Sequence, residues 1–303
     1  MRHFFYLFLL LSLGLSTPSH ARPPGPLAVV SLPFDLPGGL VVLRNLTVNG
    51  QTGDFLLDTG CVFDLVLEQA AFAGQLGAPM TRGLSVNGQV NQYQVPGVSF
   101  QFGAVRYAGL TAVATSLAAI RPAVGPRLLG LVGLGLLRDY EVVLDYAHRR
   151  LTCYPWRSAR RAAFPFVRTD SLGFTLTGSG PVVSGHIGRV PVQLLLDTGA
   201  MRNNMDLAFS QTLPAAGRLR LLSTAPVTGL AGQLLARSAI LPSLQVGATE
   251  WRELPFLVVT LAQPTKRRLP YQALLGFPFL SQNVVVSFHF GRQQLYSLQP
   301  KRA

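Results

Sequence analysis

Short apolar runs bounded by turn residues follow one another along most of the chain. Gly and Pro are frequent, at 30 and 22 residues, and only 13% of residues are charged, which favours short strands joined by turns over long exposed helices. Apolar runs of this kind occupy residues 40–48 and 55–57. Strand-like pairs lie at 141–146 with 150–154 and at 283–290 with 294–298. The pattern therefore predicts a mostly β protein.

Two hairpins and four short helices complete the predicted elements. Residues 84–95 contain Asn87-Gly88, a pair that supplies the positive φ angles of a tight hairpin turn. A counterpart at 227–240 turns near Ala231-Gly232. Short helices are expected at 68–75, 134–140, 207–213 and 277–283.

One pattern occurs twice in the chain. Asp58-Thr59-Gly60 follows a run of leucines, and Asp197-Thr198-Gly199 does the same 139 positions later (197 minus 58). Two later landmarks repeat in the same order, 98–103 and 131–137 in the first copy and 242–247 and 274–280 in the second. Chance similarity between apolar stretches does not preserve such an order. We therefore divide the chain into a first lobe at 27–156, an Arg-rich linker at 157–164 and a second lobe at 165–299.

The first 21 residues have the features of an export signal. A short basic start precedes an apolar run at 4–15, and Ser19-His20-Ala21 resembles a small-x-small cleavage site. An uncleaved N-terminal anchor is the alternative. We expect residues 1–21 to be removed, leaving no stable membrane span, and we expect a periplasmic or secreted protein.

The formal net charge of +13 changes this interpretation little. The basic residues are mostly Arg and are scattered, with clusters only at 157–161 and 266–268, so we predict no nucleic-acid binding. The histidines and the two cysteines, Cys61 and Cys153, show no metal-ligand spacing, so no metal or other cofactor is expected. An exported chain could join the two cysteines in a disulfide, and the sequence leaves that open.

The two Asp-Thr-Gly turns carry the candidate chemistry. Each aspartate ends a buried strand, where an unpaired carboxylate is unfavourable, and a two-fold arrangement would bring Asp58 and Asp197 face to face. Two carboxylates in one site do not both ionise easily, so they hold one proton between them over a range of pH. The ionised member then takes a proton from water while the other donates to a substrate carbonyl.

The residues that follow the aspartates would support this pair. The hydroxyls of Thr59 and Thr198 can each donate to the opposite backbone and accept in return. Gly60 and Gly199 let the backbone approach the carboxylates and offer N–H donors. A single such turn is ordinary turn chemistry, and the matched pair is what indicates a site.

With these motifs the sequence resembles the retropepsin-like aspartic peptidases, in the bacterial branch with two catalytic copies in one chain. The resemblance covers nearly all of the expected mature chain and includes the apolar motifs that end at Gly133 and Gly276. It implies an all-β fold with two tandem closed antiparallel β-barrel lobes, each with short helices, and an active site between them. It also implies flaps at Gly88 and Gly232. Cys61 departs from the Ala or Ser common in the family, and a cysteine-nucleophile role is not expected because no histidine partner is apparent.

The resemblance implies an aspartic endopeptidase that hydrolyses polypeptides with a water activated between Asp58 and Asp197. Because one chain supplies both carboxylates, a monomer is sufficient for catalysis. A catalytically silent peptide-binding envelope protein on the same fold is the alternative. A structural or adhesive β-protein, with Asp-Thr-Gly as ordinary turns, predicts that the two carboxylates lie far apart.

Overall fold

The computed structural model describes residues 6–8, 27–80, 83–85, 87–157, 164–261 and 269–301 of the 303-residue chain. Most of the predicted signal segment at 1–21, and residues 158–163 of the predicted linker, lie outside these ranges. Strand β1 (Tyr6–Phe8) is the described part of that segment.

The first lobe is a closed barrel of six strands. In barrel order each strand pairs with the next, and a further pairing between the first and last closes the ring. The strands in this order are β3 (Val42–Val48), β4 (Gln51–Asp58), β10 (Leu128–Gly133), β5 (Leu65–Glu68), β9 (Val105–Thr115) and β8 (Tyr93–Phe102).

The second lobe has a barrel of the same connectivity, closed by a pairing between β15 and β19. Its strands in barrel order are β15 (Gly180–Ile187), β16 (Val190–Leu196), β21 (Ala273–Leu275), β17 (Asn203–Asp206), β20 (Thr249–Val259) and β19 (Gly232–Val246). Short β14 (Thr175–Thr177) adds to the edge at β15. The predicted all-β fold with two lobes is confirmed.

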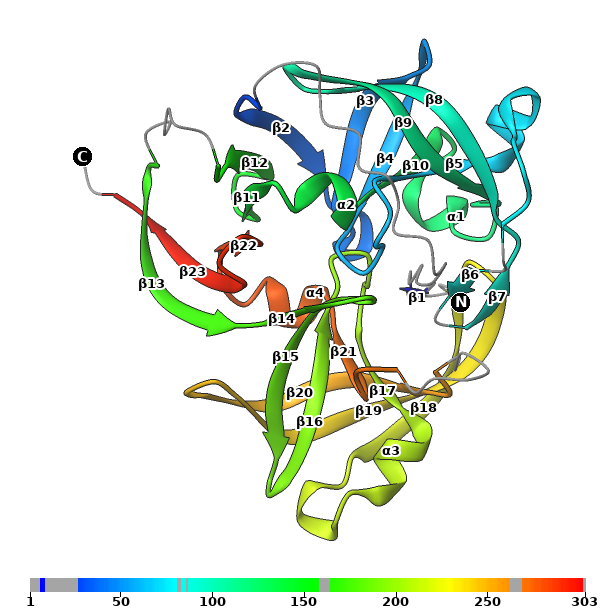
Figure 1. Ribbon diagram of the computed structural model, residues 1–303. Helices are drawn as coiled ribbons and strands as arrows, with labels where there is room; N and C mark the ends of the chain where they lie inside the picture. The colour runs from blue at the N-terminus through cyan, green and yellow to red at the C-terminus, as the bar shows by residue number, and fades with distance from the viewer. Residues whose placement is uncertain are drawn as a thin grey trace.

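A third group of strands joins the lobes (Figure 1). The pairing of β11 with β22 crosses from one lobe to the other, with Val143 opposite Ser287. In order across this joining sheet the strands are β13 (Phe166–Gly173), β23 (Gln294–Pro300), β22 (Val285–His289), β11 (Tyr140–Asp145), β12 (Arg150–Pro155) and β2 (Val30–Asp35). The pairs β11–β12 and β22–β23 confirm the strand pairs predicted near the end of each lobe.

Alternation along β11 gives the joining sheet two buried faces. Tyr140, Val142 and Leu144 belong to the large apolar core that runs through both barrels. Val143 points the other way and packs in a small cluster with Val285. Because successive side chains of a strand point to opposite faces, one sheet supports the lobes on one side and carries a second cluster on the other.

The helices are short. They comprise η1 (Pro37–Gly39), η2 (Gln69–Gln75), α1 (Arg121–Val124), α2 (Leu134–Leu137), α3 (Leu207–Thr212), η3 (Ala215–Gly217) and α4 (Phe277–Leu280). All four predicted helices are present, but η2 is a 3-10 helix, and α2 and α4 end three residues earlier than predicted. For α2 the reason is that Tyr140 already begins β11. Within the described ranges, no helix has the length and apolarity needed to cross a membrane.

The first hairpin is shorter than the sequence predicted, and the second is longer. The first pairs β6 (Gly83–Ser85) with β7 (Gly88–Val90), and residues 93–95 belong to β8 instead. The second pairs β18 (Arg220–Gly229) with β19 and is longer than the predicted 227–240. Strand β1 pairs in parallel with the end of β18, at Val227 to Gly229.

A central strand lies beneath each Asp-Thr-Gly turn. Strand β10 runs between β4, to which it is parallel, and β5, to which it is antiparallel, and Gly133 is in register with Asp58. Strand β21 has the same position between β16 and β17. A β-carbon built on Gly133 would lie 2.2 Å from the carbonyl oxygen of Phe63 and 2.8 Å from that of Cys61. Glycine is therefore required where this strand crosses under the turn.

We predict that Gly133→Ala destabilises the protein by about 2 kcal/mol or more, because the new methyl group meets backbone atoms that side-chain motion does not displace. The measurement is the midpoint of urea-induced unfolding. Gly178→Ala is the matched control, since no heavy atom lies within 4 Å of a β-carbon there. Equal midpoints for the two variants would contradict this account of the crossing.

Candidate active site

The two Asp-Thr-Gly turns meet between the lobes. Strand β4 ends at Asp58, and Asp197 follows the end of β16, so each strand delivers its aspartate to the same place. The N–H of Asp197 donates to the carbonyl of Leu275 in the central strand at 3.0 Å. Apolar strands on both sides bury the two carboxylates completely, with no exposed surface.

Thr59 and Thr198 fasten the two turns to each other by reciprocal hydrogen bonds. The hydroxyl of Thr59 donates to the carbonyl of Leu196 at 2.9 Å and accepts from the N–H of Thr198 at 3.0 Å. The hydroxyl of Thr198 donates to the carbonyl of Leu57 at 2.9 Å and accepts from the N–H of Thr59 at 3.0 Å. Four buried hydrogen bonds thus fix the turns with a two-fold relation.

The two glycines bring each turn against the opposite carboxylate. Gly60 N–H donates to Oδ1 of Asp58 at 2.9 Å, and Gly199 N–H donates to Oδ1 of Asp197 at 2.7 Å. A β-carbon on Gly60 would lie 3.0 Å from Cγ of Asp197, and one on Gly199 would lie 2.8 Å from Cγ of Asp58. Any larger residue would press on the opposite carboxylate. This contact excludes the far-apart carboxylates that ordinary, unrelated turns would give.

One oxygen of each carboxylate, Oδ2 of Asp58 and Oδ2 of Asp197, is buried and has no hydrogen-bond partner among the described residues. Burial raises the pKa of Asp58 to about 7. Burial, and next the negative charge of Asp58, raise the pKa of Asp197 well above its ordinary value. Such a pair retains one proton at mildly acidic pH and presents one donor and one acceptor to a polar group placed between the two carboxyl groups.

Cys61 serves the turn through its backbone. Its carbonyl accepts from the N–H of Leu134 at 2.7 Å, and the equivalent Ala200 carbonyl accepts from the N–H of Phe277 at 2.9 Å. A backbone role tolerates either side chain, which explains the difference between the copies. Cys61 and Cys153 are both free and buried, in separate apolar clusters. Burial raises the pKa of the Cys61 thiol well above its ordinary value, so the thiol is protonated and unsuited to act as a nucleophile.

The tips of the two hairpins touch, and Asn87 makes the contact. Its Nδ2 donates to the carbonyl of Gly232 at 2.7 Å, and its Oδ1 accepts from the N–H of Ala231 at 3.1 Å. A β-carbon on Gly229 would lie 2.4 Å from Oδ1 of Asn87, so the missing side chain leaves room for the amide. Gly88 lies beside the same tip, where its β-carbon would be 3.0 Å from that of Ala231.

Two supporting residues, Asn87 and Asn203, lie outside the motifs that the sequence repeats. Asn87 was expected only as a turn residue, and no motif indicated that its side chain bridges the hairpins. Asn203 lies six positions after Asp197, and its amide accepts from the N–H of Gly276 at 3.0 Å and donates to the carbonyl of Pro255 at 3.1 Å. Asp64 lies six positions after Asp58, so the two copies each have a polar residue at the same distance from the aspartate, and both are buried. This repeated polar position was the available sequence signal for a supporting role.

The described part of the chain contains no group of three or more His, Cys, Asp or Glu side chains placed to hold a metal ion. The arrangement is instead a buried carboxyl pair, supported by backbone donors and closed in by the surrounding turns.

We predict that this pair makes stability depend on pH. The pKa of Asp58 is raised from 3.8 to about 7, so the folded state binds the proton more tightly than the unfolded chain does. The stabilisation that comes from this tighter proton binding is fully present below about pH 3.8 and is lost as the pH rises through about 7. Thermal unfolding across that range should show a fall in midpoint that is smaller for Asp58→Asn. Parallel curves for the wild type and the variant would contradict the assignment.

The second lobe matches a known protein family. Residues 183–279 match a family model described as aspartyl protease. A search of curated proteins found no match. Among solved structures, the chain is similar to the crystal structure of basic 7S globulin from soybean, with 13% identity, a TM-score of 0.44, and coverage of 90% of this chain and 95% of that one. Most of the second lobe thus matches the aspartyl protease family, which confirms the predicted resemblance to aspartic peptidases for residues 183–279.

Proposed function

We propose that the protein is an aspartic endopeptidase that hydrolyses peptide bonds with a water held between Asp58 and Asp197. The observation that carries the proposal is the buried carboxyl pair, whose two Oδ2 atoms have no partner among the described residues. The family match of residues 183–279 supports a protease-type chemistry. No step of the mechanism requires a cofactor, and one chain supplies both carboxylates.

The reaction follows from one shared proton. The ionised carboxylate takes a proton from the water while the water oxygen bonds to the carbonyl carbon, and the protonated carboxyl gives its proton to the carbonyl oxygen. The resulting diol returns one hydroxyl proton as the C–N bond breaks, and the leaving nitrogen takes a proton from the pair. The pair ends with one proton, as it began. The threonine hydrogen bonds hold the two carboxylates at a fixed separation throughout, which limits the reorganisation needed in each step.

An extended polypeptide is the substrate that the hairpins fit. Both carboxylates are fully buried, so a substrate reaches them only after a covering segment moves. The hairpins tipped by Asn87 and Ala231 meet at their ends and are suited to open and close as flaps. The pairing of β1 with β18 gives an example of an extended segment added to this hairpin edge.

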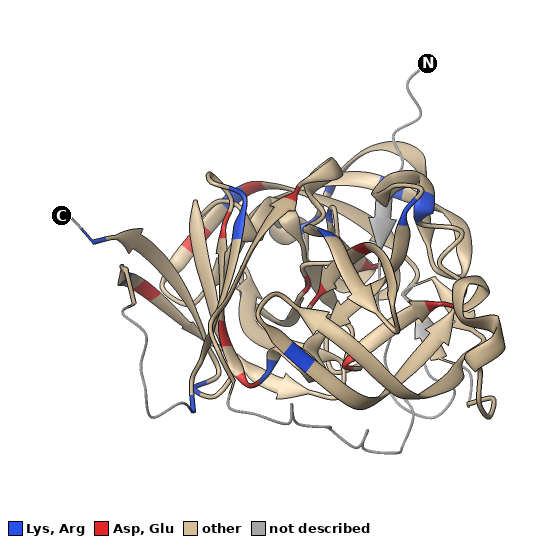
Figure 2. Ribbon diagram, turned by 90° about the horizontal axis from the view of Figure 1, so that it is seen from above, with Lys and Arg blue, Asp and Glu red and all other residues tan. Residues whose placement is uncertain are grey.

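The alternatives predict different behaviour. A catalytically silent peptide-binding protein would keep the fold and bind polypeptides without cleaving them. A nucleic-acid binder would gather its basic residues on one face, whereas Lys and Arg of the described chain are spread over both lobes (Figure 2). We also propose that the protein acts in the periplasm or outside the cell, because of the export signal expected at 1–21.

We predict that Asp58→Asn and Asp197→Asn each lower kcat by at least about a thousandfold, because either change removes the shared proton relay. The measurement is cleavage of a denatured protein across acidic to neutral pH, in which the wild type gives a bell-shaped profile. Asp170→Asn is the control, since it makes the same change at an exposed position. A folded wild type that binds the polypeptide but never cleaves it would support the silent-binding alternative.

We predict that Asn87→Ala lowers kcat/KM about tenfold, since it removes two hydrogen bonds that join the flap tips. Gln89→Ala, on the exposed side of the same hairpin, is the matched control. Steady-state kinetics on one peptide would compare the two variants, with thermal unfolding to show that both fold. Unchanged kcat/KM in Asn87→Ala would mean that the contact between the tips has no part in closure.

A further inference from the structure

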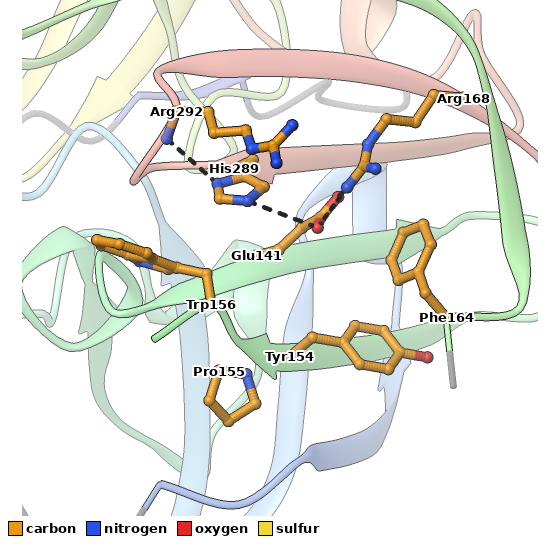
Figure 3. A pocket seen from close by; sticks show the side chains of 8 residues that line it. All are labelled: Glu141, Tyr154, Pro155, Trp156, Phe164, Arg168, His289 and Arg292. Carbon is orange, nitrogen blue, oxygen red and sulfur yellow. Dashed lines mark hydrogen bonds and ion pairs between the residues drawn. The ribbon is translucent and has the colours of Figure 1, made fainter. Parts of the chain in front are cut away.

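A second pocket lies on the joining sheet, on the face that does not support the barrels. It has a volume of about 120 Å³ and takes residues from both lobes. Arg292, His289 and Arg168 lie along one side, and Trp156, Pro155 and Tyr154 along the other (Figure 3). None of these residues belongs to the carboxyl pair or to the flaps.

The floor of the pocket is a buried carboxylate that is already neutralised. Arg168 Nη2 donates to both oxygens of Glu141, at 2.8 and 2.7 Å, and Ser287 donates to one of them at 2.9 Å. The guanidinium of Arg168 also lies over the ring of Tyr296, 4.4 Å from its centroid, and over that of Phe164 at 5.0 Å. Because Glu141 is paired with Arg168, and Arg168 is stacked on two rings, the floor of the pocket is a fixed ion pair and not a free carboxylate.

His289 offers an N–H donor beside the ion pair of Glu141 and Arg168. Its Nδ1 accepts from the backbone N–H of Arg292 at 3.2 Å, so in the neutral ring the proton is on Nε2. Nε2 is 3.9 Å from Oε2 of Glu141, which is too long for a hydrogen bond. Burial lowers the pKa of His289, which favours the neutral ring. An acceptor entering the pocket would therefore find an N–H available.

Arg292 adds an uncompensated positive charge. It is exposed at the mouth of the pocket, and the described residues give its guanidinium no acidic partner. The guanidinium of Arg157 lies over the ring of Trp156, 4.4 Å from its centroid, and Arg157 is not among the residues that line the pocket. Among the charged residues that line the pocket, Arg168 and Arg292 stand against Glu141, so the site carries a formal charge of +1 with His289 neutral (2 minus 1). This balance favours an anionic ligand.

The opposite wall of the pocket is aromatic, and the side chain of Trp156 is held in one orientation. A β-carbon on Gly291 would lie 2.5 Å from the Trp156 indole, so glycine at this turn leaves room for the ring. The indole Nε1 donates to the carbonyl of Arg138 at 2.8 Å, which fixes its orientation. Gly291 packs against the indole and the Arg157 guanidinium lies over it, so the ring lines the pocket in a fixed orientation.

We propose that this pocket binds a carboxylate carried on a small apolar or aromatic group. The carboxylate would pair with Arg292 and accept from Nε2 of His289, while the apolar part packs against Trp156 and Tyr154. Two sources share this chemistry, a free aromatic acid and the C-terminal residue of a peptide. The proposal concerns a site separate from Asp58 and Asp197, and it does not depend on the peptidase activity.

The test is titration with phenylacetate, followed by indole fluorescence in a Trp251→Phe background. The chain has two tryptophans, so this change leaves Trp156 as the only indole. We expect saturable binding in the millimolar range or tighter, at least tenfold weaker binding of phenylacetamide, and at least tenfold weaker binding to Arg292→Gln. Arg292→Lys should retain most of the affinity. Arg189→Gln, which loses the same charge at an exposed turn in the second lobe, should bind as the wild type does.

A peptide ending in free Phe and the same peptide with a C-terminal amide separate the two sources. Tighter binding of the free-acid peptide than of phenylacetate assigns the site to peptide C-termini, and the reverse order assigns it to small acids. The same titrations in Asp58→Asn should be unchanged, so the outcome is independent of the proposed catalysis. Equal binding of phenylacetate and phenylacetamide, unchanged binding by Arg292→Gln, or no saturable signal would overturn the proposal.

Discussion

The structure depends on holding two carboxylates together in a place that is buried from bulk solvent. An ionised carboxylate without partners is strongly disfavoured there, and two adjacent ones more so. The reciprocal hydrogen bonds of Thr59 and Thr198 keep the turns in contact despite this repulsion, because each hydroxyl satisfies one donor and one acceptor of the opposite backbone. A proton shared by the two carboxylates removes the repulsion between two negative charges, and it also provides an acid and a base in one site.

Other features of the fold are consistent with that requirement. Each turn must approach the opposite carboxylate, so glycine stands at positions 60 and 199, and a central strand must pass beneath each turn, so glycine stands at 133 and 276. Two closed barrels hold these strands, and the joining sheet fixes one barrel against the other through β11 and β22. The joining sheet also brings Glu141 of the first lobe and His289 of the second lobe together. They form a polar cluster that is separate from the carboxyl pair.

Much of the fold could be predicted because its information is local. The repeated Asp-Thr-Gly and apolar-glycine motifs indicated the two lobes and their paired strands, and the geometry places Asp58 and Asp197 together as expected. Helix ends and hairpin lengths were less accurate, since tertiary pairing decides where a strand such as β11 begins. The side-chain bridge of Asn87 and the pocket around Arg292 were not predicted, because both join residues more than a hundred positions apart without a recurring motif.

Asp58 and Asp197 should titrate as one coupled pair. Carbon-13 NMR of aspartate carboxyl groups, assigned with the two Asp→Asn variants, would follow both resonances as the pH is raised from about 3 to about 9, a range that brackets ordinary and raised carboxyl values. Both resonances should respond to the same two steps, the second well above the ordinary aspartate range, and either single variant should abolish the two-step behaviour. Two independent titrations near the ordinary value would contradict this coupling.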